Sequence, residues 1–88
     1  MGYRSEDIEW RTEKQREYAE TKYGPFTSTH EGYGVLCEEV EELLQAIRNN
    51  NPEAVFAEAI QVAAVAQRIA ECVTLPASRR RSGMGELK

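Results

Sequence analysis

The stretch EEVEELLQAIRNNNPEAVFAEAIQVAA, residues 38–64, decides the fold. It opens with four glutamates in five residues and ends in a segment where Gln61 is the only polar residue between Ala59 and Ala66. The NNNP segment separates the two halves, and a proline suits the first turn of a new helix. The stretch therefore predicts two helices joined by a short turn, one rich in glutamate and one nearly apolar.

A third helix is predicted ahead of this pair. Ser5 is a good N-cap, acidic residues follow it in the first turn, and Gly24-Pro25 provides the stop signal. Strand-like alternation over four or more residues is absent from the sequence. We therefore expect an all-α fold, an antiparallel bundle completed by oligomerisation, with helices at 5–23, from Thr29 or His30 to the NNNP segment, and from Pro52 to about Thr74.

The length and the charge of the chain limit the partners that we expect. The 88 residues make one domain, which we place at 1–74, with a flexible basic tail at 75–88. A chain this short is often marginal alone, so we expect a homodimer or homotetramer. The domain holds 14 acidic against 7 basic side chains, whereas the tail holds 4 basic against 1 acidic. An acidic domain repels a nucleic-acid backbone, so we expect no nucleic-acid partner unless the tail provides the contact.

We expect a cytoplasmic protein, because the sequence shows no targeting signal. No apolar run approaches the roughly 18 residues of a membrane span, and the segment MGYRSEDIEW lacks a signal-peptide core. Cys37 and Cys72 match no metal or redox spacing and are expected to be reduced thiols.

The faces of the second helix distinguish its glutamates. One face is wholly apolar, and we interpret it as the core face; it comprises Tyr33, Leu36, Val40, Leu43 and Ile47. A face containing Glu38 and Glu41 has no apolar residue and is expected in solvent. On the third face, Glu39 and Glu42 lie one turn apart between apolar neighbours.

The third helix has a similar polar pair, Glu58 and Gln61, on an otherwise apolar surface. If the two helices pack antiparallel, Glu39 and Glu42 face this pair. Three carboxylates brought together repel one another and favour a hard divalent cation, Mg²⁺ or Mn²⁺. The chemistry indicated is cleavage of a phosphate ester or phosphoanhydride by a metal-activated water. Solvated helix surface stays open as the alternative, although a buried Glu58 without a partner favours a site.

These residues carry a family resemblance. HEGYGVLCEEVEELLQAI, followed 16 residues after Glu42 by EAIQVAAVAQRIA, resembles the MazG-like all-α nucleoside triphosphate pyrophosphohydrolases, which are related to the dimeric dUTPases. Their pattern is EExxE on one helix and ExxD on the next. The resemblance covers residues 23 to about 71. It implies a helical bundle completed by dimers or tetramers, and Mg²⁺-dependent hydrolysis of a nucleoside triphosphate to the monophosphate and pyrophosphate.

The resemblance also implies roles for individual residues. Glu38, Glu39 and Glu42 match EExxE, and Glu58 matches the glutamate of ExxD, so Glu39, Glu42 and Glu58 would bind the metal beside an activated water. Glu38 and Glu39 are the catalytic candidates, although the helix face places Glu38 in solvent. Gln61 falls where the family has Asp; its amide oxygen can ligate a metal but contributes no charge.

The first helix offers two substrate-binding candidates. Arg11, Gln15, Tyr18 and Lys22 lie on one line, where cations suit phosphates and a tyrosine face suits a base. An ordinary charged amphipathic helix is the better explanation of the line as a whole. Lys22 is the exception, because it adjoins the Gly24-Pro25 loop that should border the cleft.

Two further candidates lie on the other helices. His30, at a helix start, would contact phosphate or simply cap the helix. Arg68 would reach a phosphate, or pair with Glu71 or with a carboxylate of a partner subunit.

Three hypotheses follow. The first is a Mg²⁺-dependent enzyme acting on the α–β phosphoanhydride of a nucleotide. The second is a nucleotide-binding sponge or sensor that lost turnover at Gln61, and the third is a structural or regulatory helical oligomer. The sequence favours the first, with the second next.

Overall fold

The computed structural model describes residues 2–73, and these contain three helices and no strand. They are α1 (Ser5–Tyr23), α2 (Thr29–Arg48) and α3 (Pro52–Glu71). The expected all-α bundle is confirmed. The third helix ends three residues earlier than Thr74, with Cys72 as its C-cap. The basic tail expected at 75–88 lies outside the described residues.

The start of α1 differs from the prediction. Ser5 is the first helical residue and not the N-cap; Arg4 occupies the cap position and makes no side-chain hydrogen bond there. The helix ends as expected, because Gly24 adopts a φ of 79°, which glycine tolerates best. The start of α1 is therefore supported by Glu6 and Asp7 in the first turn more than by a cap.

The start of α2 and the turn into α3 are fixed by local hydrogen bonds. Ser28 caps α2 by accepting from the Glu31 amide, and the Glu31 carboxylate accepts in return from the amide and hydroxyl of Thr27. These bonds lower the pKa of Glu31. In the turn after α2, Asn50 adopts a φ of 54°, and Asn51 caps α3 by accepting from the Ala54 amide.

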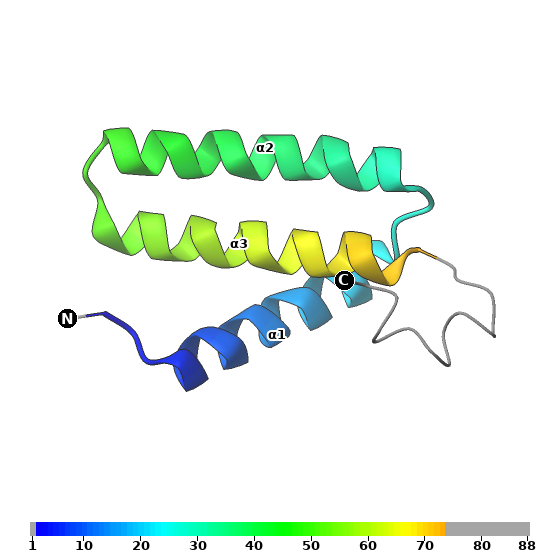
Figure 1. Ribbon diagram of the computed structural model, residues 1–88, viewed down its shortest axis with the longest axis horizontal. Helices are drawn as coiled ribbons and strands as arrows, with labels where there is room; N and C mark the ends of the chain where they lie inside the picture. The colour runs from blue at the N-terminus through cyan, green and yellow to red at the C-terminus, as the bar shows by residue number, and fades with distance from the viewer. Residues whose placement is uncertain (1, 74–88) are drawn as a thin grey trace, which may run out of the picture.

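Helix α3 is the centre of the bundle. Helices α2 and α3 run antiparallel side by side, and α1 crosses α3 obliquely (Figure 1). Both α1 and α2 pack on α3, and no Cα atom of α1 comes within 8 Å of one in α2. Half of the buried apolar residues come from α3, with single contributions from α1, the loop after it and α2; they are Ala19, Phe26, Ala46, Ile60, Ala64 and Val65. The apolar third helix is thus covered on two sides within one chain.

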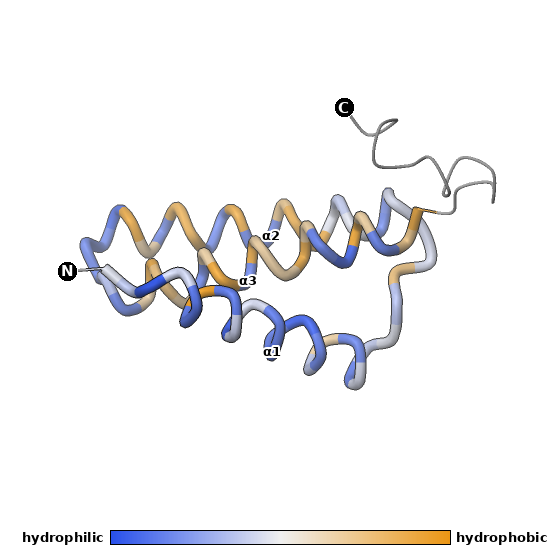
Figure 2. The backbone as a smooth tube through the Cα atoms, turned by 60° about the horizontal axis from the view of Figure 1, so that its bottom comes forward, coloured by the Kyte–Doolittle hydropathy of each residue, from blue (hydrophilic) through white to orange (hydrophobic). Residues whose placement is uncertain are grey.

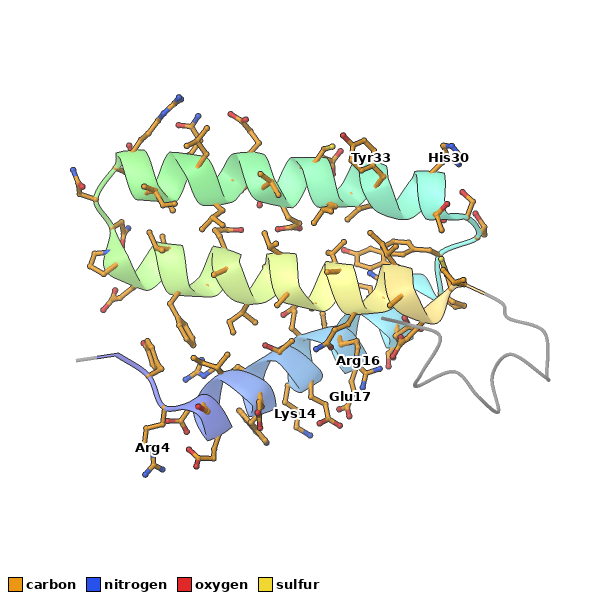
Figure 3. The ribbon with its side chains drawn as sticks, viewed as in Figure 1. Arg4, Lys14, Arg16, Glu17, His30 and Tyr33 are labelled. Atoms are coloured by element: carbon orange, nitrogen blue, oxygen red, sulfur yellow. The ribbon has the colours of Figure 1, made fainter. Side chains whose placement is uncertain are left out.

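The face of α2 that packs on α3 is only partly the one expected, because Leu36 and Leu43 are half-buried but the other three members of that face are exposed. Tyr33 (65% exposed), Val40 (46%) and Ile47 (51%) lie largely in solvent, and Tyr33 projects from the outer side of α2 in Figure 3. The buried positions are Gly32 and Ala46, small residues near the two ends of the helix. They allow close approach, since a Cβ at Gly32 would lie 2.5 Å from Ile69 Cγ1. The helix is therefore turned so that the face carrying Glu39 points inward.

Hydropathy along the chain follows this arrangement. Hydrophobic residues concentrate in α3 and recur along α2, whereas α1 is mainly hydrophilic (Figure 2). Within residues 2–73, no helix combines the length and the apolarity needed to cross a membrane. Both cysteines are free thiols, as expected.

Candidate metal and nucleotide site

The hairpin of α2 and α3 brings three carboxylates to one place. Glu39 and Glu42 lie one turn apart on α2, and α3 runs antiparallel beside them. One carboxylate oxygen each of Glu39, Glu42 and Glu58 lies within 4.8 Å of the other two. The convergence predicted from the two polar pairs is therefore confirmed.

Two of these carboxylates are partly withdrawn from water. Glu39 and Glu58 are half-buried, whereas Glu42 is exposed. Burial, followed by the charges of Glu42 and Glu58, raises the pKa of Glu39 to about 7. Burial, followed by the charge of Glu42, also raises the pKa of Glu58. At neutral pH the cluster thus carries like charges that no neighbouring cation compensates within the described residues.

The donor set fits a hard divalent cation. The Oε1 atoms of Glu39 and Glu58 are buried and have no hydrogen-bond partner. A buried polar atom without a partner costs free energy, and so does unrelieved repulsion between carboxylates. A cation bound by carboxylate oxygens removes both costs, and Mg²⁺ and Mn²⁺ prefer oxygen ligands. Glu39, Glu42 and Glu58 are the residues that would hold it.

The cluster lines a cavity of about 560 Å³ between α1 and α2, with α3 as its floor. Four other residues singled out in the sequence also line it, namely Tyr18, Glu38, Gln61 and Arg68. Glu38 is exposed as its helix face predicts, yet it borders the cavity as the motif predicts. Gln61 is half-buried, one helical turn from Glu58. The two polar pairs of the sequence thus face the same space.

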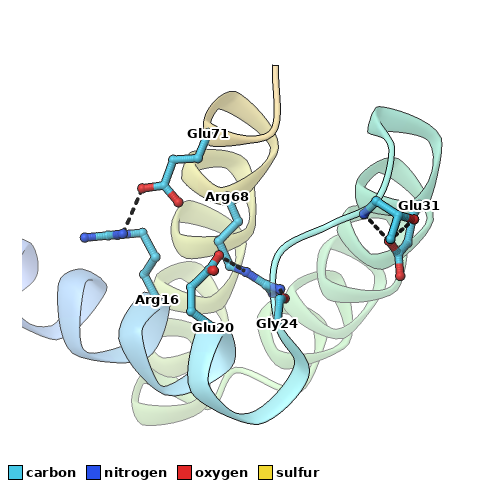
Figure 4. Close-up of polar contacts among 7 residues, drawn as sticks. Arg16, Glu20, Gly24, Glu31, Arg68 and Glu71 are labelled. Carbon is cyan, nitrogen blue, oxygen red and sulfur yellow. Dashed lines mark hydrogen bonds and ion pairs between the residues drawn. The ribbon is translucent and has the colours of Figure 1, made fainter. Parts of the chain in front are cut away.

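Arg68 is held by the protein itself. Its side chain is only 5% exposed; Nε–H donates to Glu20 Oε2 (3.1 Å) and the terminal Nη2–H donates to the Gly24 carbonyl (2.8 Å), as Figure 4 shows. The guanidinium also lies 4.1 Å from the centre of the Phe26 ring. The expected alternative partner, Glu71, pairs with Arg16 instead. Arg68 therefore fastens the end of α1 and the following loop to α3, at one wall of the cavity.

Lys22 and His30 lie outside the cavity lining. Lys22 is close to it, because its ammonium donates to the Tyr18 hydroxyl (3.2 Å) and lies 5.3 Å from the centre of the Tyr23 ring. The bond to Tyr18 is the main cause that raises the pKa of Lys22. His30 is exposed on the outer side of α2, next to the start of the helix (Figure 3).

The aromatic and charged residues of the cavity wall that were not anticipated are Tyr23, Phe26 and Glu31. The sequence does predict that the loop after α1 borders the cleft. Phe26 is the one large apolar residue in the loop segment GPFTSTH, which is a sign that this loop folds back against the bundle.

Comparison of the chain with protein families, curated proteins and solved structures gives no match.

Proposed function

We propose that this chain is a Mg²⁺-dependent nucleoside triphosphate pyrophosphohydrolase, a divergent small member of the MazG-like group. It would hydrolyse the α–β phosphoanhydride to give the nucleoside monophosphate and pyrophosphate. One observation carries the proposal: carboxylates from two helices converge on the wall of a large cavity, with the buried Oε1 atoms of Glu39 and Glu58 unpartnered. A glutamate-rich solvent surface would not bury such atoms.

The residues have distinct roles in this proposal. Glu39, Glu42 and Glu58 hold the cation, and the Gln61 amide adds a neutral oxygen one turn beyond Glu58. When bound, Mg²⁺ neutralises phosphate charge and lowers the pKa of a coordinated water. Glu38, exposed at the edge of the same cavity, can orient the attacking water and accept its proton.

The nucleoside has a place at the end of the cavity away from the α2–α3 turn. Tyr18, Tyr23 and Phe26 line that end, and the two exposed tyrosines offer ring faces for a base. Lys22 stands beside the two tyrosines and supplies a positive charge at this nucleoside end of the cavity. Arg68 acts here as a positioning residue, because its donors are occupied by Glu20 and Gly24.

Self-association and a cytoplasmic location belong to the same proposal. The exposed apolar residues of α2 have no cover within the described chain, because α3 is the only helix among residues 2–73 on which α2 packs. A second copy that presents the same face buries them, as in a two-fold symmetric dimer. Burying this face does not require the cavity residues of α1 to move.

Pyrophosphate release tests the proposal. The assay is run with Mg²⁺, then with EDTA, on canonical, deoxy and modified nucleoside triphosphates, and the nucleotide product is identified by chromatography. Monophosphate plus pyrophosphate supports the enzyme. A nucleotide-induced rise in melting temperature without any product supports the binding protein that lost turnover at Gln61. No product and no thermal effect of nucleotide or Mg²⁺ contradicts both.

A further inference from the structure

A second cavity lies beside the first, between α1 and the opening turns of α3. Its volume is about 290 Å³, and its lining includes two cations, Arg11 and Lys14, and two aromatic rings, Trp10 and Phe56. No acidic residue among residues 2–73 lines it. In the first cavity the charges are reversed: of the residues that the structure describes, five glutamates and one cation line it, and that cation, Arg68, is already engaged.

The two cavities meet at a pair of amides. Gln15 of α1 and Gln61 of α3 each line both cavities. An extended ligand can therefore pass from the glutamate cluster over these amides toward Arg11 and Lys14. A glutamine amide suits such a crossing, because its NH₂ group donates to anionic oxygens while its oxygen faces a cation. An aspartate at position 61 would instead place a negative charge on the path.

The cations of the second cavity are available to a ligand. Among residues 2–73, no carboxylate lies within ion-pair distance of Arg11, whose guanidinium carbon lies 5.7 Å from the centre of the Phe56 ring. Lys14 makes one exposed ion pair, with Glu17 at 3.6 Å, and its ammonium lies 5.7 Å from the centre of the Trp10 ring. Exposed pairs of this kind contribute little free energy, so a polyanion can displace Glu17.

We propose that the second cavity binds the two terminal phosphates of the substrate, the part released as pyrophosphate, through Arg11 and Lys14. This inference rests on the proposed function and gives the substrate a direction: base toward Tyr18 and Tyr23, terminal phosphates toward Arg11. The substrate class becomes nucleoside triphosphates in preference to monophosphate esters. It also gives Gln61 a role at the crossing that an aspartate could not fill.

Pyrophosphate binding is the test, because it requires no turnover. The affinity of the full chain for inorganic pyrophosphate is measured by calorimetry with Mg²⁺, for wild type and for Arg11→Gln/Lys14→Gln. The control variant Arg4→Gln/Arg48→Gln also removes two positive charges, but from positions that line neither cavity. Losing two charge-assisted contacts should weaken binding by at least about tenfold in the first variant alone.

The outcomes separate this inference from the function on which it rests. Suppose that wild type releases pyrophosphate from triphosphates, but the two double variants bind pyrophosphate as tightly as wild type or lose the same affinity. The phosphate subsite is then wrong and the enzyme stands. If no triphosphate is hydrolysed but pyrophosphate binding depends on Arg11 and Lys14, the subsite stands and the activity is wrong. If the enzyme is active, Arg11→Lys should bind pyrophosphate more tightly than Arg11→Gln/Lys14→Gln, because it keeps a cation at position 11. In Arg11→Gln/Lys14→Gln, the KM for triphosphate should rise by a larger factor than kcat falls.

Discussion

Arg68 of α3 and Glu20 of α1 form an ion pair 3.1 Å long, in which the arginine side chain is only 5% exposed. A second ion pair joins the same two helices a turn further on, between Arg16 and Glu71 at 2.8 Å, but its side chains are 26% and 47% exposed. Distance alone ranks the second pair as the stronger. Burial reverses the ranking, because an arginine out of water depends on its partners for the hydrogen bonds that water would make.

We expect Arg68→Met to destabilise the fold much more than Arg16→Met. Removing Arg68 leaves the half-buried Glu20 carboxylate and the Gly24 carbonyl without their donor, a loss of about 3–5 kcal/mol. Removing Arg16 breaks a solvent-screened pair, which contributes about 0–1 kcal/mol. Urea unfolding followed by circular dichroism measures both. If both substitutions lowered the free energy of unfolding equally, Arg68 would not be the residue that holds α1 on α3.

Gly32 and Gly34 form a matched pair for the α2–α3 contact. A Cβ at Gly32 meets Ile69 Cγ1 at 2.5 Å and Phe26 Cδ2 at 3.0 Å, whereas one at Gly34 meets nothing within 4 Å. Gly32→Ala should destabilise by about 1–3 kcal/mol through overpacking. Gly34→Ala should stabilise by up to about 1 kcal/mol through helix propensity. Thermal unfolding decides, and stabilisation by both substitutions would contradict the close packing of α2 on α3.

Removing a carboxylate from the cluster should abolish Mg²⁺-dependent turnover. Glu39→Gln and Glu58→Gln each take a charged ligand from the proposed ion, and loss of even an indirect contact to a metal costs about 10–100-fold. We therefore expect at least a hundredfold loss in kcat/KM, with the helical circular dichroism spectrum unchanged. Glu41→Gln is the control, because Glu41 is exposed and outside the cavity. Activity of the cluster variants within about threefold of wild type would remove the metal-site assignment.

The stability of the metal-free protein should fall as the pH rises. The pKa of Glu39 is about 7 in the folded chain against an ordinary value of 4.5, so folding binds a proton in this interval. The stability this proton provides is complete below about pH 4.5 and is lost as the pH passes 7. The melting temperature in EDTA should therefore decrease from pH 5 to pH 8. Glu39→Gln should reduce that decrease and Glu41→Gln should not.

Mg²⁺ should oppose the same loss. Because ligation needs the ionised carboxylates, the ion should raise the melting temperature at pH 8 and have little effect at pH 5. A rise of the same size at both pH values would indicate binding elsewhere.

We expect the chain to be a dimer or larger at micromolar concentration, and a charge on the outer face of α2 should make it monomeric. Val40 (46% exposed) and Ile47 (51%) lie one above the other on that face. Val40→Lys/Ile47→Lys places two charges where a second copy would bury apolar surface. Multi-angle light scattering measures the mass, with Gln45→Lys/Arg48→Glu as a surface control. A monomeric wild type would contradict the proposed association.

The sequence predicts helix boundaries and the carboxylate cluster well, because both depend on local signals. The Gly24-Pro25 stop, the first-turn proline at Pro52 and the one-turn spacing of Glu39 and Glu42 each act within a few residues. The orientation of α2 was predicted only in part, for a different reason. Apolar content favours the face of Tyr33, Val40 and Ile47, but close approach to α3 at Gly32 and Ala46 determines which face is buried.

The partner of Arg68 was likewise beyond the sequence. Glu71 lies three residues away on the same helix and is the local choice, whereas Glu20 is 48 residues distant and becomes the partner only when α1 packs on α3. The second cavity depends on the same packing, since its lining joins α1 with the first turns of α3. Pairings between distant segments are set by tertiary geometry, which no helical periodicity encodes.

Helices α1 and α2 share α3 as their support, and no Cα atom of one comes within 8 Å of a Cα atom of the other. All three clustered carboxylates therefore belong to one hairpin, while Arg11, Lys14, Gln15 and Tyr18 belong to a separate element. Under the proposed function, the reaction and the choice of substrate reside on parts of the chain that can vary independently. New specificities could then arise, or be engineered, by rewriting α1 alone, with the metal ligands of the hairpin left as they are.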